Sequence, residues 1–121
     1  SPGVSRINKK TTVAEMIRSR KIPTALFFMN DEMASGGIRA FHELSNLEIP
    51  KDVSVVGFDN SAWSLMTSPQ LTTISAPVMQ MGKFAVQRLF AKIKNGGDYS
   101  PCSTQMETYF IPRKSTDKPR Q

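Results

Sequence analysis

The spacing of apolar positions changes along the chain, and each spacing predicts a different kind of element. Residues 25–29 (Ala-Leu-Phe-Phe-Met) are all apolar, which is typical of a strand buried on both faces inside a parallel sheet. Over residues 31–45 the apolar side chains instead recur every three or four positions, which predicts a helix with one apolar face. Residues 53–58 are again largely apolar and predict a second strand. This order of strand, helix and strand, over about 35 residues, indicates a βαβ unit with parallel strands.

Further elements are predicted on both sides of this unit. They are a short helix at residues 11–20, a strand-prone stretch at 71–75, a long helix at 77–95 and a last strand at 105–112. Residues 1–10 and 113–121 are polar and basic without a period, so we interpret them as tails. The predicted fold class is therefore α/β, built on parallel βαβ layers.

Polar side chains stand where each of the two predicted parallel strands ends. Asn30 and Asp31 follow the first strand, and Asp59 and Asn60 follow the second. Because open parallel sheets bind ligands beyond the carboxyl ends of their strands, Asn30 and Asp59 are expected to project into one crevice. An amide and a carboxylate suit a polyhydroxylated ligand, whose hydroxyl groups can donate to the carboxylate oxygens. Helix capping would also explain these polar residues. Both interpretations stay open for Asn30 and Asp59, and capping is favoured for Asp31.

Three residue types that occur once in the chain bear on its chemistry. Trp63 could stack on a sugar ring, although burial in the core or in a subunit interface is favoured. His42 lies within a predicted helix, and nothing in the sequence indicates a catalytic partner for it, which disfavours a Ser-His-Asp arrangement. Cys102 cannot form an internal disulfide, and one cysteine with one histidine offers too few ligands for zinc. We therefore predict no catalytic residues, no metal site and no cofactor, and we disfavour an enzyme.

Composition narrows the picture further. The 121 residues suit one domain, and no apolar run approaches the ~20 residues that a membrane-spanning helix needs. The formal net charge is +6, but the lysines and arginines are spread out and are not interleaved with aromatic residues as in single-strand binders. Most of them are expected on solvated faces, with some attraction to polyanions as the alternative.

Three segments, read in order, carry a family resemblance: PTALFFMNDEMASGGIRAF, IPKDVSVVGFDN and SPQLTTISAPVMQMGKFAVQRLFAKI. Together with the closing YFIPRKST, they resemble the LacI/GalR family of bacterial transcription regulators. The resemblance implies part of a periplasmic-binding-protein-like (type I) core with two subdomains. Residues 11–74 would belong to the C-terminal subdomain, and residues 75–112 to the crossover and to a helix and strand of the other subdomain.

The resemblance also implies a function and a set of site residues. Asn30 and Asp59 match positions that contact a small effector in the family, and the family often has a second Asp at the position of Asn60. The chain would sense a sugar or related polyol and form a homodimer in the cytoplasm. It would reach DNA only through a module missing from this chain. The residues expected at the dimer interface are Met33, Gly37, Phe41 and Met66. A periplasmic sugar-binding receptor of a transport system is the alternative.

Overall fold

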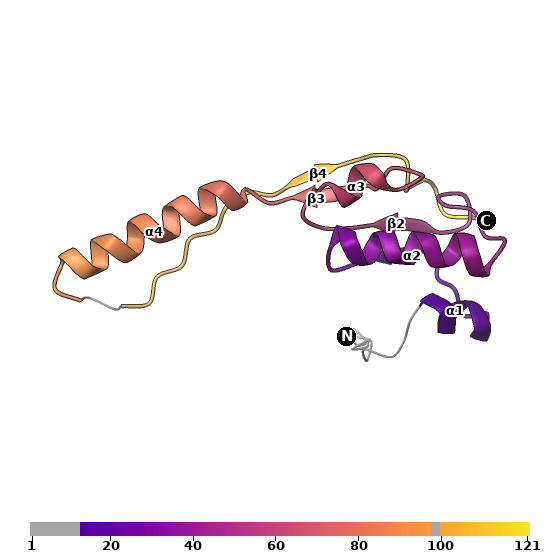
Figure 1. Ribbon diagram of the computed structural model, residues 1–121, viewed down its shortest axis with the longest axis horizontal. Coiled ribbons are helices and arrows are strands. Elements are labelled where there is room, and N and C mark those ends of the chain that lie inside the picture. The colour runs from indigo at the N-terminus through magenta and orange to yellow at the C-terminus, as the bar shows by residue number, and fades with distance from the viewer. Residues whose placement is uncertain (1–12, 98–99) are drawn as a thin grey trace.

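The two predicted parallel strands lie side by side in the computed structural model, which describes residues 13–97 and 100–121. Strand β1 (Ala25–Phe27) pairs with β2 (Ser54–Val56) in parallel, with Ala25 opposite Ser54. Helix α2 (Asp31–Leu44) connects them and runs along β2, as Figure 1 shows. The expected βαβ unit is therefore confirmed. Residues 1–10, which we interpret as a tail, lie outside the described residues.

The core forms where the apolar face of α2 meets β2. Ala34 and Phe41 have no exposed surface and Ile38 is nearly covered, in keeping with their spacing of three and four along the helix. Helix α1 (Val13–Ser19) contacts α2, and Val13 joins the same cluster. The other buried apolar residues of this core are Ile49, Val53, Val55 and Leu71. Helix α1, the βαβ unit and Leu71 thus contribute to one core.

Strand β1 is shorter and more exposed than its apolar run predicts. Phe27 is 62% exposed and Met29, just beyond the strand, is 80% exposed. Ala25 and Phe27 lie on the same face of the strand and both are exposed, so the described part of the chain leaves that face open. The expectation of a strand covered on both faces is therefore wrong for β1 within this chain, whereas Val55 of β2 is fully buried.

A second, antiparallel pair follows. Strand β3 (Thr73–Ser75) pairs with β4 (Tyr109–Ile111), so the last strand is shorter than the predicted residues 105–112. Between them α4 (Val78–Lys94) extends away from the βαβ unit (Figure 1). None of its residues is buried, and its predicted inner face is open in the described part of the chain. A short helix, α3 (Trp63–Met66), lies between β2 and β3. No helix in the described ranges is both long and apolar enough to span a membrane.

The C-terminal segment is held against β2, so the interpretation of residues 113–121 as a tail needs correction. Ser115 is fully buried, and its hydroxyl donates to the Val55 carbonyl (2.6 Å) while it accepts from the Thr72 N–H (2.8 Å). The Val55 N–H in turn donates to the Ser115 carbonyl (2.8 Å). Further along, the Asp117 N–H donates to the Ser54 hydroxyl (3.0 Å). Composition alone could not reveal these contacts, because they join residues 43 to 63 positions apart.

Two glycines provide a paired test of this packing. A methyl group at Gly57 would collide with the Asp31 carboxylate and lie 2.8 Å from a Leu71 methyl, whereas one at Gly36 would meet nothing within 4 Å. Gly57→Ala should therefore lower the free energy of unfolding by about 1–3 kcal/mol through overpacking. Gly36→Ala, within α2, should raise it by roughly 0.5–1 kcal/mol. Urea denaturation followed by circular dichroism measures both, and a shift in the same direction for the two variants would contradict the packing described.

Candidate functional site

The polar residues that follow β1 and β2 lie at one edge of the parallel pair. The backbone ladder continues past the strands, because the Phe28 N–H donates to the Val56 carbonyl (2.8 Å) and the Asp31 N–H donates to the Phe58 carbonyl (3.0 Å). The carboxyl ends of parallel strands meet at the same edge. Asn30 and Asp59 therefore both stand at the edge where ligands bind in sheets of this kind.

Asn30 is the N-cap of α2. Its backbone is extended and its side-chain oxygen accepts from the Met33 N–H (2.8 Å). This confirms the capping interpretation for Asn30, and it leaves a second role open. The capping bond uses the amide oxygen alone, so the NH₂ group can still donate to a ligand.

Asp59 does not cap a helix. The next helix, α3, has Ala62 as its N-cap and no side-chain cap bond. Asp59 is exposed, and no ion pair to its carboxylate occurs among the described residues. Its backbone is unusual, with φ 112°, and its N–H donates to the Ile74 carbonyl (2.9 Å). Asp59 therefore combines a fixed backbone with a carboxylate that can accept from a ligand.

Asp31 has a different role from the cap that its position suggests. It is fully buried, and its Oδ2 accepts from the Ser61 N–H (2.7 Å) and the Ser61 hydroxyl (3.2 Å). Its Oδ1 accepts from the Thr73 hydroxyl (2.6 Å). The capping prediction for Asp31 is therefore wrong: the carboxylate turns away from the helix backbone because donors from the loop after β2 and from β3 surround it.

Arg113 makes contacts that the sequence pattern did not indicate. Its Nη2 donates to the Asn60 side-chain oxygen (2.8 Å) and its Nη1 donates to the Leu71 carbonyl (3.0 Å). The Arg113 N–H also donates to the Thr72 hydroxyl (2.9 Å). The guanidinium thus anchors the residue that follows Asp59. No local signal could have identified it, since 53 positions separate Arg113 from Asn60.

The structure divides the residues expected at a dimer interface into two groups. Met33 and Met66 are exposed, at 51% and 74%. Phe41 is fully buried in the core and Gly37 is buried against the ring of Phe28, so neither can offer a side chain to a partner. Both lie on the apolar face of α2 that packs inward, and their inclusion was wrong for that reason. Trp63 is 43% exposed, so it is not one of the buried core residues.

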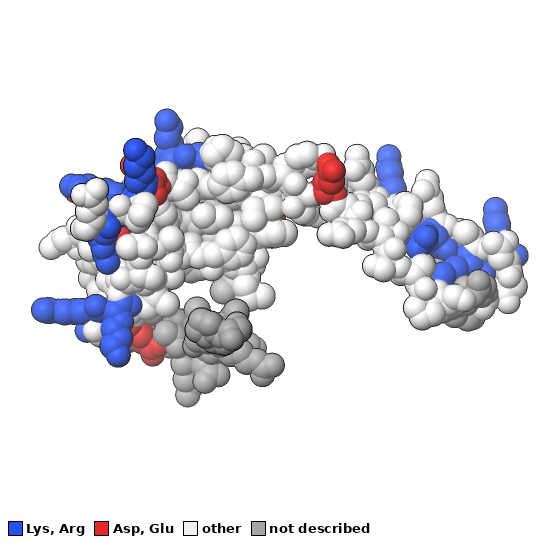
Figure 2. All heavy atoms as spheres, turned by 180° about the vertical axis from the view of Figure 1, so that it is seen from behind, with Lys and Arg blue, Asp and Glu red and all other residues white. Residues whose placement is uncertain are grey.

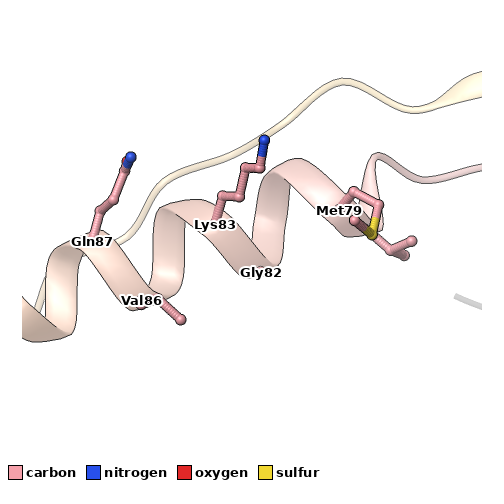
Figure 3. A pocket seen from close by; sticks show the side chains of 6 residues that line it. Met79, Gly82, Lys83, Val86 and Gln87 are labelled. Atoms are coloured by element: carbon pink, nitrogen blue, oxygen red, sulfur yellow. The ribbon is translucent and has the colours of Figure 1, made fainter.

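A hollow in the described surface lies away from this edge. Its lining residues all come from α4, as Figure 3 shows for Met79, Gly82, Lys83, Val86 and Gln87. The side chains stand along one helix and do not converge on a common point (Figure 3), so the hollow is an open helix surface and offers no set of polar groups for a ligand. In the described part of the chain, no group of three or more His, Cys, Asp or Glu residues could hold a metal ion.

On the face shown in Figure 2, charged side chains gather at the two ends of the described chain. Figure 2 shows Lys and Arg over the far part of α4 and over the opposite end of the chain, while the surface between them carries few charges. On the face in view, the described Lys and Arg side chains do not form a continuous basic stripe of the kind that nucleic acid requires. One ion pair is short: Glu43 accepts from Arg39 (2.7 Å) and raises the pKa of that guanidinium. Both residues are on the solvent side of α2, away from the site.

Comparison with known proteins identifies the family. A family model described as "Periplasmic binding protein-like domain" matches residues 3–116. The chain is 40% identical over 99 residues to the HTH-type transcriptional repressor PurR of Aliivibrio fischeri, a match that covers 82% of this chain and 29% of the repressor. This chain belongs to the LacI-type family of periplasmic-binding-protein-like regulators. It spans less than a third of that relative's length.

Solved structures of LacI-type members agree with this fold. The lac repressor dimer, bound to operator and the anti-inducer ONPF, superimposes with a TM-score of 0.76 at 33% identity, over 86% of this chain and 35% of that one. The complex of the transcriptional regulator CelR with cellobiose gives a TM-score of 0.73 at 27% identity, over 85% of this chain and 31% of that one. The expected periplasmic-binding-protein-like fold class is therefore confirmed.

Two substitutions separate the capping role of Asn30 from other roles. Asn30→Asp should change the free energy of unfolding by less than ~0.5 kcal/mol, because a carboxylate also accepts from the Met33 N–H and is favourable at a helix N-terminus. Asn30→Ala should lower it by roughly 1 kcal/mol, since that N–H loses its acceptor. Chemical denaturation of the chain measures both values. An equal loss in the two variants would contradict the capping role.

Proposed function

We propose that this chain is the effector-binding and dimerisation portion of a LacI-type transcription regulator that senses a small polyhydroxylated ligand. The observation that supports the proposal is that Asn30 and Asp59 both follow strands whose carboxyl ends lie at one edge of the β1–β2 pair. The Asn30 amide can donate to a hydroxyl group, and the exposed Asp59 carboxylate can accept from one or two. Such paired donors and acceptors are the groups by which a sugar is held in one orientation.

The proposal extends to a mechanism. Ligand bound at this edge would favour one arrangement of the two subdomains, and that shift would change DNA affinity through parts of the protein outside this chain. The antiparallel β3–β4 pair supports this mechanism. The chain leaves the βαβ unit toward α4 through β3 and returns from α4 through β4, so the two connections lie side by side. We expect the protein to act in the cytoplasm, as a DNA-binding regulator would, and we assign it no catalytic activity.

A homodimer interface is the second part of the proposal. Helices α2 and α3 contact each other, and large apolar side chains on both remain exposed. These are Met33 on α2 and Trp63, Leu65 and Met66 on α3. Contiguous exposed apolar side chains of this kind favour a protein partner. Trp63 is the residue that the two proposed sites share, since it could also stack on a sugar ring.

The alternative, a periplasmic sugar-binding receptor, has the same fold and would use the same edge. What favours the regulator is the identity of 40% to a transcriptional repressor over most of the chain. The sequence upstream of this chain in its gene distinguishes the two, because a regulator carries a helix-turn-helix and a receptor carries a signal peptide.

The effector site can be tested at Asp59. A panel of cellobiose, maltose and glucose 6-phosphate is first screened by thermal shift on the full-length protein, and the compound that binds is used for calorimetry. Asp59→Ala should weaken its binding by more than ~1.5 kcal/mol, the upper range for losing a charge-assisted hydrogen bond. Unchanged affinity would reject Asp59 as a ligand contact.

Asp52 supplies the matched control for this experiment. It lies just before the amino end of β2, opposite the site, and its carboxylate accepts from the Glu48 N–H (2.8 Å). Asp52→Asn and Asp59→Asn remove the same charge, and the amide oxygen introduced at position 52 could still accept from the Glu48 N–H. Only Asp59→Asn should weaken binding. Equal losses would indicate a general effect of net charge.

The dimer interface can be tested at Met66. A lysine at this exposed position would bring two like charges into a symmetric apolar contact, which disfavours association. Met66→Lys should therefore weaken dimerisation of the full-length protein by at least about tenfold, or ~1.4 kcal/mol. Sedimentation equilibrium measures the dissociation constant, and circular dichroism checks that the fold is intact. A dimer of unchanged affinity would remove α3 from the interface.

A further inference from the structure

The turn that carries Asp59 adopts a backbone that non-glycine residues rarely adopt. Asp59 has φ 112° and Asn60 has φ 55°. A left-handed backbone at such residues costs of order 1–3 kcal/mol each and persists only where surrounding contacts enforce it. Without those contacts the turn would relax, and the Asp59 carboxylate would point elsewhere. Whatever enforces this turn therefore decides where the carboxylate is presented.

Two of the three contacts that hold the backbone of this turn lead to the buried Asp31. Each N–H of the turn has a partner: that of Asp59 donates to the Ile74 carbonyl, that of Asn60 to the Thr73 hydroxyl (3.3 Å) and that of Ser61 to Asp31 Oδ2. Thr73 can accept in this way because its own proton is donated to Asp31 Oδ1 (2.6 Å). Asp31 thus acts on the turn directly through Ser61 and indirectly through the orientation of the Thr73 hydroxyl.

We propose that Asp31 is a positioning residue for effector binding: its carboxylate holds residues 59–61 in the left-handed turn that presents Asp59 to the ligand. The inference rests on the proposed function, and it names a residue that does not itself touch the ligand. It also explains why the chain has an acid at a fully buried position. Three donor contacts meet there, and a carboxylate is the side chain that only accepts.

The surroundings of Asp31 allow a buried carboxylate without a cation. Asp31 is the first residue of α2, where the helix dipole favours a negative charge. Its three donor contacts replace the water that burial removes. Gly57 leaves the space, since any side chain there would collide with Oδ1. Residues of helix α2, of the segment after β2 and of strand β3 therefore all surround the Asp31 carboxylate.

Hydrogen exchange tests the positioning role without any ligand. In Asp31→Ala, the backbone amides of residues 59–61 should exchange at least ~10-fold faster, whereas the core amides Val55 and Gly57 keep their rates. Asp31→Asn should accelerate the turn much less, because its amide oxygen can still accept from the Ser61 N–H and its NH₂ group can donate to Thr73. Ser54→Ala is the control: it removes the bonds to Asp117 at the far end of β2 and should leave the turn unchanged.

Two outcomes would overturn the proposal. Unchanged exchange at residues 59–61 would show that Asp31 does not hold the turn, and equal acceleration at all core amides would show a role in global stability only. If Asp31→Ala does not fold, Thr73→Val separates the two contacts at nearly constant shape. It removes the hydroxyl that links Asp31 to the Asn60 N–H, so exchange at Asn60 should accelerate, whereas the Ser61 amide, which is still bonded to Asp31, should keep its rate.

A double-mutant cycle connects the turn to binding and separates this inference from the proposed function. With the panel compound that the unmodified full-length protein binds, Asp31→Ala should weaken binding at least ~10-fold. In the Asp59→Asn background the same change should cost less than about twofold, because the group being positioned is already lost. Additive losses would overturn the role of Asp31. If Asp59→Asn alone has no effect, the proposed effector site fails, and exchange still decides whether Asp31 holds the turn.

Discussion

The parallel pairing of β1 with β2 is the constraint on which the rest of the structure depends. Parallel neighbours require a crossover, which α2 provides, and they bring their carboxyl ends to one edge. Backbone hydrogen bonds at Phe28 and Asp31 carry the register past the strands to the polar residues themselves. A slip of one residue would turn every side chain to the opposite face, removing Val55 from the core. Core packing and the placement of Asn30 and Asp59 are thus consequences of one register.

Buried polar groups tie distant segments of the chain to this pair. Asp31 joins α2 to the turn at residues 59–61 and to β3, and Ser115 joins the C-terminal segment to β2 and to Thr72. No buried side-chain nitrogen or oxygen in the described residues lacks a hydrogen-bond partner. Each of these groups would cost about 1–3 kcal/mol if its partner were absent, so alternative arrangements of these segments are penalised. The polar contacts therefore specify one arrangement where apolar packing alone would tolerate several.

The apolar surface that remains open is as informative as the core. The outer part of β1, the whole of α4 and the patch on α2 and α3 carry large exposed apolar side chains. Under the proposed function, the first two are faces that the remainder of a two-subdomain core would cover, and the third is the face that a second subunit would cover. Asp59 is bonded through its N–H to Ile74 of β3, so under the proposed function a change in the arrangement of the subdomains would act next to the proposed ligand site.

The sequence alone determined the βαβ unit, the long helix α4 and the polar ends of two parallel strands, because these follow from local apolar spacing. Three family-like segments in order also pointed to the LacI-type fold. Tertiary structure decided the rest. Asp31 has the composition and position of a helix cap, yet donors from Ser61 and Thr73 draw its carboxylate into the interior. Phe41 lies on the apolar face that the spacing along α2 predicts, but only the tertiary structure shows that this face packs into the chain's own core and not against a second subunit. The polar segment around Ser115 is buried by contacts with β2. Contacts between residues thirty to sixty positions apart leave no periodic pattern in the sequence. The roles of Asp31, Arg113 and Ser115 therefore follow only from the tertiary structure.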